Sequence, residues 1–269
     1  MGIFRRIVVL AALALVCASA QAQGSIRVQP GDWGAASVQD IEVVLRSVAD
    51  VLLPDFPQHA AARIVVRPSA LGPRVLAEKT ADGSYQVLLN VHDARWDQFA
   101  YQFSHELCHI VSNYEQRDIG AVPGERPHQW FEEAVCEAVS LIALDRLAAQ
   151  WEHAAPHRGW ASYAPAFRQY AQALLSHGHR QLPPGTTFSA WYAEHAAAMA
   201  RDPYLRADDE RVATALHEIF NGGGLTSIGY LNLAHASQES FAGYLAAWSD
   251  CCPEAQRVLV QKLIALFTT

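Results

Sequence analysis

Five consecutive residues carry the clearest chemical signal in this sequence: His105-Glu106-Leu107-Cys108-His109. The pattern is His-Glu-x-x-His, and on a helix its two histidines, four residues apart, lie on the same face. Both imidazoles can then bind one metal ion, while the neighbouring carboxylate of Glu106 can act as a base toward a water molecule. The pattern therefore predicts a zinc site with hydrolytic chemistry.

The helix predicted over 94–115 would leave room for an ion beside the two histidines. Its large apolar side chains fall on one stripe, whereas His105 and His109 lie on the opposite side with smaller or polar neighbours. The stripe consists of Trp96, Phe99, Phe103, Leu107, Ile110, Val111 and Tyr114, and the histidines share their side with Tyr101, Cys108 and Ser112. The alternative interpretation is a solvated face on which the two histidines bind nothing.

A tetrahedral catalytic zinc takes three protein ligands and leaves one position open, so a third ligand must come from elsewhere. The helix predicted over 127–151 is apolar nearly all round, which is typical of a buried helix. Acids in such a helix need a cation, a metal ion or hydrogen-bond donors, and Glu133 and Glu137 share one of its faces. Glu133 is therefore the predicted third ligand. The alternative is that Glu132, Glu133 or Glu137 pairs with an arginine or reaches solvent.

These two segments resemble known metallopeptidases. Residues 105–114 read H-E-L-C-H-I-V-S-N-Y, which is similar to H-E-L-T-H-A-V-T-D-Y in the active helix of thermolysin-like enzymes. Residues 132–137 read E-E-A-V-C-E, which is similar to their N-E-A-I-S-D helix, and 130–134 resemble W-L-N-E-G in aminopeptidase relatives. Together these families are the gluzincins, and the resemblance covers about 95–145 of the chain.

The gluzincin resemblance implies a zincin-like α+β fold, a Zn²⁺ cofactor and a peptide or protein substrate. Carried over by position, His105, His109 and Glu133 would bind zinc, Glu106 would be the catalytic base and Glu137 would hydrogen-bond a ligand histidine. The downstream histidine motif of the thermolysin-like enzymes has no counterpart here, nor does the amine-binding motif of the aminopeptidases. The resemblance therefore stays at superfamily level, and a zinc-binding scaffold without turnover is the alternative function.

No motif marks the residue that would stabilise the oxyanion. Tyr230 and His217 rank first because they flank the glycine run at 222–224, which could shape the wall of a cleft. Further candidates are His235, Tyr204 and His92. Each of these residues taken alone is more typical of a structural or exposed position. The His177-Gly178-His179 segment is interpreted as a loop rather than as a second metal site.

Residues 1–22 have the layout of a Sec-type signal peptide. Arg5 and Arg6 precede an apolar run at 7–16, and Ala20-Gln21-Ala22 supplies a cleavage site between small residues. We therefore expect export to the periplasm or secretion, with an uncleaved anchor as the alternative. The formal net charge of −7 and the lack of Lys/Arg runs argue against nucleic acid as a partner. No later stretch reads as a transmembrane helix, and the oligomeric state is left open.

The four cysteines of the predicted mature chain are an even number, which in an exported protein favours disulfides. Cys108 precedes His109, and Cys136 follows Glu133 by one helical turn, so the two cysteines would meet if both helices reach the metal. A bridge between them would add on the order of 3 kcal/mol. The alternatives are free buried thiols, a bridge within Cys251-Cys252, or a pairing of each of these with one of the first two.

The hydrophobic pattern predicts a small sheet followed by a helical body, within one domain over 23–269. The α/β part would cover 23–93, after a loose lead-in at 23–36, and the helical part would cover 94–269. The front of the chain would hold a helix at 37–53, capped by Ser37, and strands at 63–67, 74–80 and 84–91, with a hairpin at Asp82-Gly83. The gluzincin resemblance implies that an edge strand borders the cleft and hydrogen-bonds an extended substrate, and the strand at 84–91 would be that strand. The helices after the two described above would cover 161–177, 188–200, 206–220, 226–235, 238–249 and 253–267.

Overall fold

The computed structural model describes residues 24–117, 128–234 and 240–268. The predicted signal peptide at 1–22 lies outside these residues. Within the described ranges, no helix is both long enough and apolar enough to cross a membrane.

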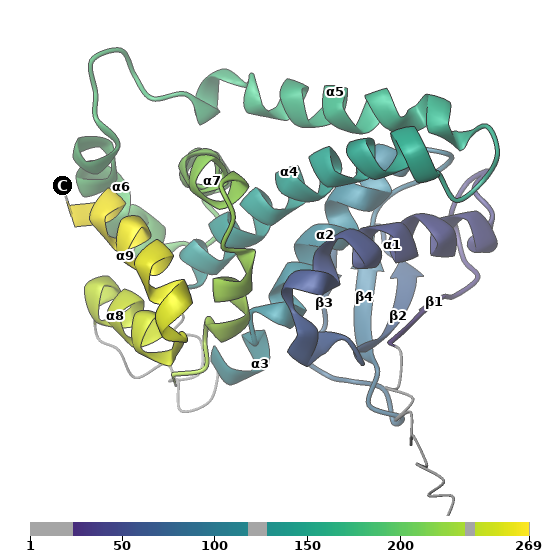
Figure 1. Cartoon of the computed structure of the whole chain (residues 1–269), viewed down its shortest axis with the longest axis horizontal. Coiled ribbons are helices and arrows are strands. Elements are labelled where there is room, and N and C mark those ends of the chain that lie inside the picture. The colour runs from purple at the N-terminus through teal and green to yellow at the C-terminus, as the bar shows by residue number, and fades with distance from the viewer. Residues whose placement is uncertain (1–23, 118–127, 235–239, 269) are drawn as a thin grey trace, which may run out of the picture.

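The front of the chain is a four-stranded mixed sheet with one long helix beside it (Figure 1). The strand order is β1-β2-β4-β3; the pairs β1-β2 and β2-β4 are parallel, and β3 is antiparallel to β4. The strands are β1 (Ser25–Val28), β2 (Arg63–Pro68), β3 (Arg74–Val75) and β4 (Tyr85–Leu89). Helix α1 (Val38–Leu52) contacts β1, and Ser37 caps it by accepting a hydrogen bond from the backbone N–H of Asp40.

Two predictions about the sheet are wrong. The expected loose lead-in contains β1, which is too short to show an alternating pattern and is held by its pairing with β2, remote in sequence. The strand expected to border the cleft, β4, lies inside the sheet, because β3 pairs along its outer side. On this side of the sheet the edge strand is therefore β3, and β1 is the edge strand on the other side. The hairpin between β3 and β4 is confirmed, with Gly83 at a φ of +79°.

After the sheet, the described part of the chain is mostly helical, so the predicted α+β class is confirmed. Its α-helices are α2 (Trp96–Val111), α3 (Tyr114–Arg117), α4 (Gln129–Ala154), α5 (Ala164–Leu175), α6 (Phe188–Arg201), α7 (Arg206–Asn221), α8 (Phe241–Cys251) and α9 (Glu254–Thr268). The short 3₁₀ segments are η1 (Leu53–Asp55), η2 (Pro57–His59), η3 (Trp160–Tyr163), η4 (Gly178–Arg180) and η5 (Leu225–Tyr230).

Helix α4 runs through the middle of the molecule and contacts α1, α2, α5, α6 and α7 (Figure 1). Both large tryptophans at its ends, Trp130 and Trp151, are fully buried. The prediction of a helix buried on all sides is therefore confirmed. Because its neighbours include the motif helix α2 and the later helix α7, polar groups carried by α4 can meet groups from distant parts of the sequence.

The helix predicted over 226–235 is wrong: only η5 forms there, and the chain turns at Asn232, whose φ is +62°. Distant side chains take the backbone carbonyls that a continuing helix would use. The Asn113 amide donates to the carbonyls of Gly229 and Leu231, and Gln58 donates to that of Gly229. These long-range hydrogen bonds are invisible to a periodicity analysis.

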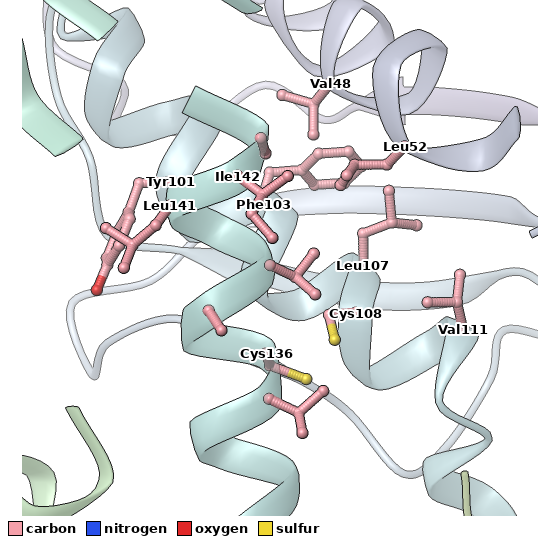
Figure 2. Packing of buried hydrophobic residues seen from close by; sticks show 14 of the residues in the cluster. Val48, Leu52, Tyr101, Phe103, Leu107, Cys108, Val111, Cys136, Leu141 and Ile142 are labelled. Carbon is pink, nitrogen blue, oxygen red and sulfur yellow. The ribbon is translucent and has the colours of Figure 1, made fainter. Parts of the chain in front are cut away.

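The apolar stripe of α2 is buried as predicted. Figure 2 shows Phe103 and Leu107 of α2 in one cluster with Val48 and Leu52 of α1. The large side chains thus face α1, which leaves the opposite side of α2 to α4 and the motif histidines.

Cys108 of α2 and Cys136 of α4 face each other between the two helices, as expected, but the disulfide predicted between them is not formed (Figure 2). Both are free thiols with no exposed surface, and Cys251 and Cys252 are free as well. Burial, together with the hydrogen bond to Cys108, raises the pKa of Cys136 well above its usual value. The pair behaves as two small core residues, the alternative that the sequence left open.

Candidate functional site

Helices α2 and α4 bring His105, His109 and Glu133 to one point. Nε2 of His105 lies 3.2 Å from Oε2 of Glu133, and Nε2 of His109 lies 3.4 Å from the same oxygen. One ligand atom from each of the three side chains lies within 4.8 Å of the others. The structure therefore assembles the three residues that the sequence predicts as metal ligands.

The spacing of these atoms fits a tetrahedral ion. Two ligand atoms each about 2.05 Å from zinc, at a tetrahedral angle, are separated by about 3.3 Å. The separations of 3.2 and 3.4 Å between the imidazole nitrogens and the Glu133 oxygen agree with this value. Two imidazoles with one carboxylate are a donor set found in catalytic zinc sites. The side chains are therefore suited to hold Zn²⁺ and leave a fourth position open.

A buried carboxylate fixes the orientation of His109. Nδ1 of His109 lies 2.6 Å from Oε1 of Glu132, which has no exposed surface. Glu132 also accepts a hydrogen bond of 2.8 Å from the side-chain amide of Asn232. The hydroxyl of Tyr244 in turn donates a hydrogen bond to Oδ1 of Asn232. When Nδ1 donates its proton to Glu132, Nε2 is free to bind a metal ion.

Glu132 has the supporting role that the resemblance assigned to Glu137. The carboxylate of Glu137 lies 3.9 Å from Nδ1 of His105, which is too far for a hydrogen bond. It accepts instead from the hydroxyl of Tyr101 and from the guanidinium of Arg180. The alternative weighed from the sequence, an acid paired with an arginine, therefore holds for Glu137. One signal could have marked Glu132: it is an acid in a helix predicted as buried, so it needs a donor.

The carboxylates around His109 favour its protonated form. Burial lowers the pKa of His109, but Glu133 and Glu132 outweigh this effect and raise it well above its usual value. Burial raises the pKa of Glu133, but His109 and His105 outweigh this effect and lower it well below its usual value. A ring nitrogen that binds zinc cannot carry a proton, so a metal ion bound at Nε2 of His109 would displace a proton from that nitrogen, while Nδ1 would keep its proton toward Glu132.

The three side chains open onto a cavity of about 490 Å³. Its walls come from the edge strand β3, from α2, from α4 and from the start of α7. Glu106 lies on this wall with 3% of its surface exposed, and the backbone N–H of Val75 in β3 donates to its carboxylate. Burial raises the pKa of Glu106. A raised pKa suits a carboxylate that must accept a proton near neutral pH.

The two residues predicted to stabilise an oxyanion, Tyr230 and His217, are not among those that line this cavity. His217 is buried on α7, 3.9 Å from Asp145, and Tyr230 ends η5 in a half-buried position. Their positions give no support to the predicted role. His92 does not line the cavity either, and His235 lies outside the described residues.

Tyr204, ranked lower from the sequence, does line the cavity. Its hydroxyl accepts a hydrogen bond of 2.8 Å from the amide of Gln129, and the same amide lies 3.1 Å from Oε1 of Glu133. Tyr204 is 65% exposed, so a molecule bound in the cavity can contact its ring. Gln129 thus links the hydroxyl of Tyr204 to the candidate ligand Glu133.

A second group of potential ligands, His177, His179 and Glu210, lies at η4 and α7, again within 4.8 Å. The sequence predicts a loop at 177–179 rather than a metal site, and the structure brings the buried Glu210 of α7 next to its two histidines. The guanidinium of Arg206 lies 2.6 Å from Glu210, and that of Arg180 lies 3.1 Å from it. Two cationic groups on one carboxylate oppose a further cation, so this group is a weak candidate for a metal site.

Asp209 is a cavity-lining acid that the sequence did not mark. It is 6% exposed, and its Oδ1 has no hydrogen-bond partner. Burial first, and then the nearby negative charge of Glu133 and other acids, raises its pKa to about 9. Without a cation beside it, this side chain is a neutral acid at neutral pH.

Substituting Glu132→Gln should weaken zinc binding about 10- to 100-fold, because the charged acceptor that orients His109 is lost. Competition with a chromogenic chelator measures this affinity. Glu152→Gln, at the exposed end of the same helix, is the control and should leave the affinity unchanged. An unchanged zinc affinity in Glu132→Gln would show that Glu132 does not support the ligand.

Asp209→Asn should stabilise the metal-free protein at alkaline pH. The folded-state pKa of about 9 lies above the unfolded value of 3.8. Between these values the unfolded chain releases a proton that the folded chain retains, so the free energy of unfolding falls as the pH rises. Thermal unfolding in a chelating buffer at pH 8 should show a midpoint at least about 2 °C above wild type, with a smaller difference at pH 5.

The neighbouring substitution Asp208→Asn is the matched control for this measurement. Asp208 does not line the cavity and lies 3.1 Å from His195, so the rise at pH 8 should be absent. Equal midpoints for wild type and Asp209→Asn at both pH values would mean that Asp209 is ionised in the folded protein.

Comparisons of the chain with protein-family models, with curated proteins and with solved structures give no match. The likeness to the gluzincins is therefore one of motif and site. A small mixed sheet followed by a helical body that carries His105, His109 and Glu133 is consistent with a zincin-like fold.

Proposed function

We propose that this chain is an exported zinc metallopeptidase, which hydrolyses peptide bonds in the cavity between β3, α2, α4 and α7. The single observation that carries the proposal is the convergence of His105, His109 and Glu133 on the wall where Glu106 also lies. A zinc-binding scaffold needs the three ligands only. The buried carboxylate of Glu106, open to the same cavity, is what favours catalysis over mere metal binding.

A zinc ion held by the three ligands would supply a Lewis acid that polarises a carbonyl and lowers the pKa of water. The protein's own contribution to the proton transfers is Glu106. It accepts a proton from the attacking water and then gives it to the leaving amine. The backbone N–H of Val75 holds the carboxylate at the cavity wall, and burial raises the pKa of Glu106, which favours its acceptance of a proton.

The position of β3 supports an extended peptide as the substrate. β3 pairs with β4 on one side only, and Pro73, Arg74 and Val75 line the cavity. An extended chain can bind along such an edge through backbone hydrogen bonds. A substrate bound there would pass beside Glu106, which already accepts a hydrogen bond from this strand.

Tyr204 takes the place that the sequence analysis gave to Tyr230 and His217. Its hydroxyl lies on the cavity wall and is joined through Gln129 to the ligand Glu133. A hydroxyl near the metal can donate a hydrogen bond to the negative charge that develops on the carbonyl oxygen. Tyr204 is accordingly the proposed oxyanion-stabilising residue.

Substituting Glu106→Gln should leave one zinc bound and lower kcat/KM at least about 100-fold, because the amide cannot accept the proton. A library of internally quenched fluorescent peptides measures the hydrolysis, and metal analysis of the same samples measures the zinc. Glu194→Gln, an exposed acid on α6, is the control with unchanged rates. Hydrolysis that persists in Glu106→Gln would remove Glu106 from the mechanism. Bound zinc without hydrolysis in the wild type would favour the scaffold.

A further inference from the structure

Five carboxyl groups line the cavity, and their surroundings differ. Four of them have partners in the structure. Glu106 accepts from the backbone of β3, Glu133 contacts both motif histidines, Glu137 accepts from Arg180, and Glu210 lies against Arg206. The fifth is Asp209, which is only 6% exposed and whose Oδ1 nevertheless lacks a hydrogen-bond partner.

The arginines near Asp209 form their ion pairs with other acids. Arg206, three residues before it on α7, directs Nε to Glu210 at 2.6 Å. The buried Arg180 directs Nη2 to Glu137 and Glu210. The adjacent Asp208 faces elsewhere, with Oδ2 3.1 Å from Nδ1 of His195. Each cation close to Asp209 is thus occupied by another acid.

A buried carboxyl oxygen without a donor costs free energy, and a cation with N–H groups is the partner that offsets this cost best. We propose that Asp209 binds a positively charged N–H group of the substrate, an ammonium or a guanidinium, and so determines specificity. This inference rests on the proposed peptidase function. An opposite charge at hydrogen-bond distance favours the carboxylate form of Asp209.

Two parts of a peptide carry such a group: a free amino terminus, and a lysine or arginine side chain. Both present N–H donors with a full positive charge. Asp209 lies on α7 and lines the same cavity as the edge strand β3, which would hold the peptide backbone. A cationic group of a peptide bound in this cavity is therefore a suitable partner for Asp209. The two sources are separated by the choice of probe peptides.

The test uses the zinc-loaded full-length mature protein and two matched pairs of synthetic peptides. One pair differs only in a free or an acetylated amino terminus. The other pair is acetylated and differs only in lysine or norleucine beside the scissile bond. Wild type should prefer the cationic member of at least one pair about tenfold or more in kcat/KM, the effect expected of a charge-assisted hydrogen bond. The pair that shows it identifies the source.

In Asp209→Asn, which keeps the shape of the side chain, this preference should fall below about threefold. The control Asp208→Asn should keep the wild-type preference, because that residue does not line the cavity. Equal rates within both pairs in the wild type would overturn the proposal. A preference that survives in Asp209→Asn would overturn it as well.

Isothermal titration of the metal-free protein with the same four peptides separates this inference from the proposed function. Tighter binding of a cationic peptide that is lost in Asp209→Asn supports the cation site even if no peptide is cut. Equal dissociation constants within both pairs, combined with efficient Glu106-dependent hydrolysis, would leave the peptidase standing and reject the role of Asp209.

Discussion

Helix α4 carries two buried acids, Glu132 and Glu137, and the half-buried Glu133 at the cavity wall, and each is matched by a donor or a cation. A buried charge without a partner costs several kcal/mol. The three acids find three different partners: Glu132 binds His109, Glu133 lies against both motif histidines, and Glu137 binds Arg180. This requirement ties α4 to α2 on one side and to η4 on the other.

The same pairings hold the candidate ligand side chains in place. Glu132 orients the ring of His109, and the amide of Asn232 donates a hydrogen bond to Glu132. The contacts with Glu133 and Glu132 raise the pKa of His109, and those with the two histidines lower the pKa of Glu133. The acids of α4 that need a positive partner therefore also create a site that favours a divalent cation. Glu106 lines the same cavity as this site.

Local patterns in the sequence were sufficient for the motif helix, for the buried helix and for Glu133, because each depends on the spacing of residues along one element. They were insufficient wherever a contact joins distant segments. Arg180 and Asn232 meet α4 from 43 and 100 residues away, and β1 exists only through its pairing with β2. The cavity-lining Tyr204 and Asp209 lie in a region without a motif. The sequence therefore ranks Tyr204 below Tyr230 and His217 and does not mark Asp209.

The central claim is that His105, His109 and Glu133 hold one zinc ion. X-ray absorption spectroscopy of the zinc-loaded protein, compared with a Glu133→Ala variant, tests it most directly. The account predicts one zinc per chain with two imidazole nitrogens and carboxylate oxygen at about 2.0 to 2.1 Å, and loss of the ion in the variant. Sulfur among the ligands, or an unchanged zinc environment in Glu133→Ala, would contradict it.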